Sequence, residues 1–133
     1  MSKTAFISLS FQQREKLAPI INNITDVLKD FHIVAKVFVN AYAFEIDDED
    51  RMMAIACEKI AHSDLLIAEV SYKAIGIGVE VGYAVGLGKP VIYMRHEDAE
   101  HSTTIAGISK YRIIYSTSDD MEKQLADKLA LIF

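Results

Sequence analysis

Short apolar runs alternate with amphipathic stretches along the whole chain of 133 residues. Some runs are rich in β-branched and aromatic residues, which favours strands; these runs are 4–9, 32–39, 64–70, 91–94 and 111–115. The run 64–70 is nearly continuous in apolar residues, as expected of a strand that is covered on both faces. Between the strands, apolar residues three or four apart predict helices whose buried faces begin at Leu17, Met53 and Met121.

This alternation predicts a doubly wound, flavodoxin-like α/β fold, with a five-stranded parallel sheet and helices on both faces. The length fits a single domain over residues 1–133. Ligands of such sheets bind beyond the carboxyl ends of the strands. We therefore expect the site in the loops that follow Leu9, Val39, Val70 and Met94.

One glycine-rich segment leads from the third strand into a helix predicted over 78–87. Gly76 and Gly78 can adopt positive φ and let the backbone approach a ligand. The helix that follows offers free N–H groups and the positive end of its dipole. Glu80 is expected in its first turn, where the dipole favours an ionised carboxylate that can serve as a nucleophile.

Other interpretations of this segment stay open. The glycines four apart from Gly78 to Gly86 would let the helix pack closely on a neighbour, and Glu80 would then only complement the dipole. Two phosphate-binding motifs are excluded. Val81 replaces a glycine of the dinucleotide fingerprint, and Tyr83 replaces the first glycine of a Walker loop.

Charge and composition indicate which partners, compartment and metal ions to expect. The net charge of −5 and the pI of about 5.3 argue against nucleic acid or an anionic membrane as a partner. Cys57 is the only cysteine, and no apolar run has the length of a signal peptide or a membrane span. We expect a soluble, cytoplasmic protein. The loop 96–101 carries metal-capable side chains without ligands from a second element, so neither a metal nor a cofactor is predicted.

Three segments resemble the nucleoside 2-deoxyribosyltransferase superfamily, which includes the 2′-deoxynucleoside 5′-monophosphate N-glycosidases. They read Ser-Asp-Leu-Leu-Ile-Ala-Glu-Val over 63–70, Gly-Ile-Gly-Val-Glu-Val-Gly-Tyr-Ala over 76–84, and Gly-Lys-Pro-Val-Ile over 88–92. The resemblance implies that Glu80 attacks the anomeric carbon of a nucleoside or nucleotide, as in a retaining glycosidase. It also implies a homodimer, or a dimer of dimers, in which a neighbouring subunit lends Ser102 to the site.

The resemblance places further residues around the substrate. Ser8, Ser10 and Arg14 follow the first strand, in a loop that nucleotide-type members use near the 5′-phosphate. Tyr72 and Tyr83 are candidates to stack on a base, with core packing as the alternative.

Several family positions differ in this chain. Ala56 and Ala74 stand where the family has polar helpers, and the family's tyrosine in strand one is replaced by Ala5 or Phe6. The acidic stretch 45–48 is a candidate to supply the missing acid. The alternatives are therefore a non-catalytic nucleotide-binding or sensor domain, and cleavage of the nicotinamide glycosidic bond of NAD.

Overall fold

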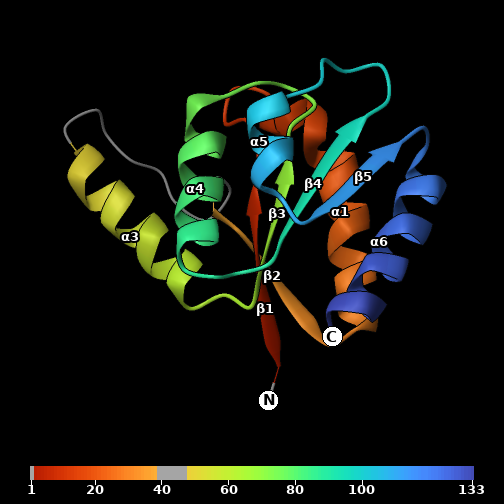
Figure 1. Ribbon diagram of the computed structural model, residues 1–133, viewed down its shortest axis with the longest axis horizontal. Coiled ribbons are helices and arrows are strands. Elements are labelled where there is room, and N and C mark those ends of the chain that lie inside the picture. Colours follow the sequence, from red (N-terminus) through yellow and green to blue (C-terminus); the bar gives the residue numbers. More distant parts are fainter. Residues whose placement is uncertain (1, 39–47) are drawn as a thin grey trace.

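The computed structural model describes residues 2–38 and 48–133 and contains one five-stranded sheet (Figure 1). All neighbouring strands are parallel, and their order is β2-β1-β3-β4-β5. The strands are β1 (Lys3–Ser8), β2 (Ile33–Val37), β3 (Leu65–Glu69), β4 (Val91–His96) and β5 (Tyr111–Tyr115). This order is that of the flavodoxin-like folds, which confirms the predicted fold class. Val39, the last residue of the run 32–39, lies outside the described residues.

Helices cover both faces of the sheet. They are α1 (Arg14–Asp30), α3 (Glu49–Ala61), α4 (Ile75–Gly86), α5 (Thr103–Ile108) and α6 (Ser118–Ile132). Figure 1 shows α1 and α6 on one side and α3, α4 and α5 on the other. The six-residue α5 was not predicted, because it is too short to display a helical repeat. None of the helices in the described part of the chain is long and apolar enough to cross a bilayer.

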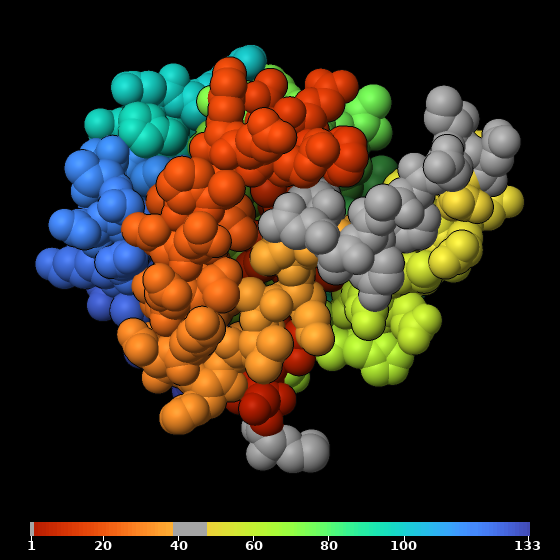
Figure 2. Space-filling model, turned by 180° about the vertical axis from the view of Figure 1, so that it is seen from behind, coloured from red at the N-terminus to blue at the C-terminus, as the bar shows by residue number. Residues whose placement is uncertain are grey.

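Two hydrophobic cores, one on each face, hold the layers together. Successive side chains of a strand point to opposite faces, so Ile67 of β3 packs under α1 and α6 while Leu66 and Ala68 pack under α4. Every residue of β3 is buried. The nearly continuous apolar pattern of this strand is thus explained by its central position. The strand β2 is instead an edge strand, and Figure 2 shows it exposed between α1 and α3.

Helix α4 starts three residues earlier than the sequence predicts. It begins at Ile75, with Ala74 as its N-cap, and it ends before Gly88, whose φ of 76° is the left-handed value that stops a helix. The buried residues Ile77, Val81 and Ala84 fix it on the sheet. This packing outweighs the poor helix propensity of the glycines in the first turn.

The chain reverses direction in the sheet order between β1 and β3. After β1 it crosses to α1 on one face, and after β3 it crosses to α4 on the other (Figure 1). The crevice outside the carboxyl ends of such a pair of strands is where doubly wound folds bind their ligands. Ser8 ends β1 at this crevice and is the residue from which the candidate site is built.

Candidate active site

Ser8 and Glu80 meet at the switch point, the place between β1 and β3 where the strand order reverses. The Ser8 hydroxyl donates a hydrogen bond of 2.5 Å to Oε1 of Glu80, joining the end of β1 to α4. Ser8 points to this face because it has the same parity along β1 as Phe6, which packs in the core under α4. Among the described residues Ser8 is the hydrogen-bond partner of Glu80, and Oε2 of the carboxylate stays available to a ligand.

The environment of Glu80 differs from the one that the sequence suggested. Glu80 is the sixth residue of α4, so it lies in the second turn and outside the short range of the helix dipole. Burial raises the pKa of Glu80 from the ordinary value of 4.5 to about 6, and the Ser8 hydrogen bond opposes this rise. The prediction that the dipole sets its ionisation was therefore wrong. Because about 6 is still below neutral pH, the carboxylate is mostly ionised at pH 7.

The two glycines before Glu80 do not form a ligand loop. Gly76 and Gly78 lie inside α4, and neither adopts a positive φ. A methyl group added at either position would meet no atom within 4 Å among residues 2–38 and 48–133, apart from its chain neighbours and the backbone of the helix itself. The same holds for Gly82 and Gly86, so among the described residues no neighbouring helix packs closely on these glycines. The glycines leave one side of α4 open.

The connection after β1 carries the other predicted polar residues. Ser10 is buried, and Arg14 is the first residue of α1. The Arg14 guanidinium lies 4.0 Å from the ring centroid of Phe11, and its Nη1 donates to the Phe11 carbonyl oxygen at 2.8 Å. No salt bridge involves Arg14 in the described parts of the chain. Its remaining N–H groups can therefore bind an anion.

Ser102 is not joined to Glu80 within the chain. It precedes α5, its backbone N–H donates to the Tyr93 hydroxyl at 3.0 Å, and it helps to line a cavity of about 360 Å³. The same cavity is lined by Ala74 and Ile75 at the start of α4. The structure thus brings Ser102 close to Ala74, where the resemblance leads us to expect a polar residue.

The remaining candidates are placed as follows. Tyr83 follows Glu80 by three residues on α4, so it lies on the same side of the helix, and its side chain is exposed. Tyr72 is exposed too, so neither tyrosine has the alternative role in the core. Ala56 is buried within α3. Of the acidic stretch 45–48, only Asp48 belongs to the described residues.

One polar residue near the site was missed by the sequence analysis. Glu69 ends β3 and is completely buried, with its carboxylate bonded to Tyr115 and to the backbone of Ser71. A charged residue inside the apolar run 64–70 was a usable signal, because glutamate is rarely buried unless it is paired. Phe11, which supports Arg14, was also missed because an exposed aromatic residue in a loop has no distinctive spacing.

Comparisons with known proteins identify the family and the fold. The model of the family "Nucleoside 2-deoxyribosyltransferase" matches residues 10–126. A protein of Thermofilum pendens named "Putative 2'-deoxynucleoside 5'-phosphate N-hydrolase 1" is 36% identical over 75 residues. That match covers 53% of this chain and 52% of the relative, so the chain spans about half the length of the curated relatives it matches.

Two solved structures share the fold. A CMP N-glycosidase from Clostridium botulinum superposes with a TM-score of 0.68 at 21% identity, covering 92% of this chain and 98% of that one. A 2-deoxyribosyltransferase from Bacillus psychrosaccharolyticus gives a TM-score of 0.69 at 17% identity, with 90% of both chains covered. At this level of identity the likeness concerns the fold.

Proposed function

Because this chain belongs to the nucleoside 2-deoxyribosyltransferase family, we propose that it cleaves the N-glycosidic bond of a deoxynucleoside or its 5′-monophosphate, with Glu80 as the nucleophile. The observation that carries the proposal is the contact between Ser8 and Glu80 at the switch point of the sheet. It joins the two elements that border the expected ligand crevice.

The geometry supports a double displacement. Oε2 of Glu80 attacks the anomeric carbon, the C–N bond breaks, and the base leaves with the electron pair of that bond. The resulting glycosyl ester is then attacked by water or by a second base, which regenerates the carboxylate. Ser8 contributes by holding Oε1 at 2.5 Å, which fixes the orientation of the attacking oxygen.

Arg14 and Ser10, in the connection after β1, would form the polar end of the pocket, next to Ser8. A guanidinium without a carboxylate partner, braced by the Phe11 ring, suits a phosphate group. Ser10 lies in the same connection and would donate its hydroxyl to a phosphate oxygen. These features favour the 5′-monophosphate over the nucleoside as substrate.

The two alanines at family positions favour a slow enzyme or, as the second candidate, a domain that binds nucleotides without cleaving them. Ala56 and Ala74 cannot transfer a proton to the leaving base. General acid–base assistance is worth on the order of 10² to 10⁴ in rate, so its absence would leave turnover weak. Acidic residues in 45–48 would restore assistance if they reach the base.

A homodimer, or a higher oligomer built from dimers, would complete the site. Glu80 is the only charged residue of α4, and it faces Ser8 at the sheet, so the outer side of the helix is uncharged. Large apolar side chains are exposed on α4, at its end and on the adjacent α5: Ile75, Val79, Tyr83, Val85, Leu87 and Ile108. Open space beside the glycines lets a second helix approach closely. A second copy on this face would bring its Ser102 toward Glu80.

The test is to incubate the protein with a panel of deoxynucleosides, their 5′-monophosphates and NAD, and to measure the released base by chromatography. We expect slow release from one or more monophosphates and none with Glu80→Gln. Release that is equally fast with Glu80→Gln would refute the assignment of the nucleophile. Binding of monophosphates without any release would favour the second candidate.

A further inference from the structure

Glu69 is a buried ionisable group at the carboxyl end of β3, the middle strand of the sheet. Its residue is fully inaccessible at the carboxyl end of β3, and no salt bridge to it occurs among residues 2–38 and 48–133. Burial raises the pKa of Glu69, although hydrogen bonds from Tyr115 and Ser71 oppose the rise. A buried carboxyl group without a cation destabilises a fold unless its hydrogen bonds are made. Its presence therefore needs an explanation.

Each oxygen of the carboxylate has its own donor. Oε1 accepts from the backbone N–H of Ser71 at 2.6 Å, and Oε2 accepts from the Tyr115 hydroxyl at 2.6 Å. The first bond links the end of β3 to the backbone two residues further along the chain. The second links the end of β3 to the end of β5. Glu69 thus joins two strand ends to the backbone that leads into α4.

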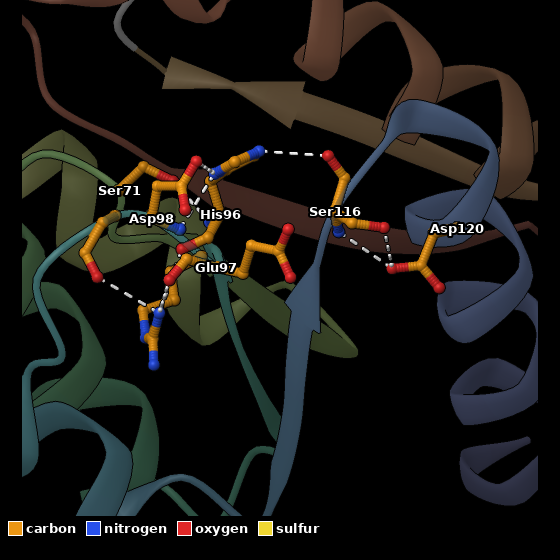
Figure 3. Close-up of polar contacts among 8 residues, drawn as sticks. Ser71, His96, Glu97, Asp98, Ser116 and Asp120 are labelled. Atoms are coloured by element: carbon orange, nitrogen blue, oxygen red, sulfur yellow. Dashed lines mark hydrogen bonds and ion pairs between the residues drawn. The ribbon is translucent and has the colours of Figure 1, made fainter.

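Ser71 extends the connection to β4. Its hydroxyl oxygen accepts from the backbone N–H of His96 at 2.9 Å, and the His96 ring contacts the carbonyl oxygen of Ser116 at 3.0 Å. Figure 3 shows Ser71 beside His96, and Ser116 across from them just before the start of α6. The backbone N–H of Ser116 donates to the Asp120 carboxylate at 2.9 Å. The carboxyl ends of β3, β4 and β5 are therefore joined to one another through Glu69, Ser71 and His96.

The start of α4 is held on the sheet by the buried side chain of Ile77, and polar contacts add to this. Its N-cap is Ala74, which provides no side-chain cap, and Ile75 is 90% exposed. The Lys73–Glu100 ion pair lies on the surface, where such pairs contribute little. The part-buried bond from the Ser71 N–H to Glu69 lies just before the first turn of this helix, and Glu80 follows one turn later.

We propose that Glu69 is a positioning residue, which fixes the β3–α4 connection and thereby holds Glu80 of α4 against Ser8. It acts through the backbone and touches no substrate. The effect on turnover rests on the function proposed above, whereas the effect on the backbone does not. The role is one of geometry, so an amide that makes the same bonds can replace the carboxylate. In Glu69→Gln, Oε1 accepts from Ser71 and the amide group donates to the Tyr115 oxygen.

The variants Glu69→Gln, Glu69→Leu, Tyr115→Phe and the control Tyr111→Phe test this role. The control removes a hydroxyl from the same strand that makes no hydrogen bond to the described residues. We expect Glu69→Leu to lower kcat by about 100-fold with little change in KM, because a displaced catalytic group loses about that much. Glu69→Gln should keep kcat within about threefold and leave the pH profile unchanged. The kcat of Tyr115→Phe should lie between those of Glu69→Leu and Glu69→Gln, and well below that of Tyr111→Phe. This variant also tests the role if Glu69→Leu does not fold.

Two measurements do not depend on activity. Hydrogen–deuterium exchange of amides 71–77 should be at least about tenfold faster in Glu69→Leu than in the wild type or Glu69→Gln, because the restraint on this segment is lost. A carbon-13 titration should place the pKa of Glu80 near 6 in the wild type and in Glu69→Gln, and lower in Glu69→Leu, where α4 admits water. If the wild type releases no base, the proposed function fails, and these two measurements still decide the role of Glu69.

The proposal is overturned by either of two results. If Glu69→Gln is as impaired as Glu69→Leu, the charge matters rather than the restraint. If Tyr115→Phe and Glu69→Leu match Tyr111→Phe in exchange and in the titration of Glu80, the network does not position α4.

Discussion

Replacement of Glu80 by glutamine should stabilise the fold at neutral pH while it removes activity. The pKa of this carboxyl rises from 4.5 to about 6 in the folded state. One pKa unit corresponds to about 1.4 kcal/mol, so the ionised side chain lowers the free energy of unfolding by about 2 kcal/mol. Glutamine has no charge to desolvate, and its oxygen can still accept from Ser8. We therefore expect a gain of about 2 kcal/mol at pH 8.

The dependence on pH identifies the cause. Below pH 4.5 the carboxyl is protonated in both states and its burial is not penalised. Between pH 4.5 and about 6 the unfolded chain ionises first, so the stability of the wild type falls relative to the variant. Above that range the difference is constant. The advantage of Glu80→Gln should thus be near zero at pH 4, appear between pH 4.5 and 6, and persist at pH 8.

Urea unfolding followed by circular dichroism at these pH values measures the difference. Glu58→Gln makes the same substitution at an exposed position of α3 and is the matched control. Base release should be lost in Glu80→Gln at every pH and retained in Glu58→Gln. An equal stability of wild type and Glu80→Gln at pH 4 and at pH 8 would refute the argument from burial.

Three more predictions concern the oligomer, the phosphate end and the cap of α4. Val85→Asp should convert a dimer into monomers in light scattering, because it places a charge on the apolar side of α4; a wild type that is already monomeric contradicts the interface. Arg14→Ala should weaken binding of a monophosphate about tenfold or more while the nucleoside is unaffected, with Lys16→Ala as the control; equal losses for both ligands reject the phosphate site. Ala74→Ser should stabilise the fold by about 1 kcal/mol, because the N-cap has extended dihedral angles and no side-chain acceptor, and it should raise turnover, alone or with Ala56→Asp. An unchanged melting temperature would contradict the role of residue 74 as a cap, and unchanged turnover would contradict its role in catalysis.

The fold could be predicted because its pattern is spread over long segments. Five β-favouring runs separated by amphipathic stretches leave few alternatives to a doubly wound sheet. The start of α4 could not be predicted in the same way. Gly76 and Gly78 are poor helix formers, and only the packing of Ile77 on the sheet, a tertiary effect, makes this stretch helical.

The site could be predicted in part. Glu80 and Ser8 were both identified as candidates, but their contact joins residues 72 positions apart and follows from the strand order. The ionisation of Glu80 depends on burial, which a local dipole argument does not contain. The network of Glu69 was missed for the same reason, since Tyr115 lies 46 positions away.

The four glycines of α4 also affect how the chain moves. Each lowers the stability of a helix by about 1 kcal/mol relative to alanine. In the part of the chain that the structure describes, no atom of another element lies within 4 Å of a methyl group added at any of the four positions. In an isolated subunit, α4 is therefore a weak helix that remains folded mainly through its contacts with the sheet. We expect it to open locally more often than α1 or α6 and to become rigid when a second subunit covers it. Association would then order the catalytic helix, so that turnover per subunit would rise with protein concentration.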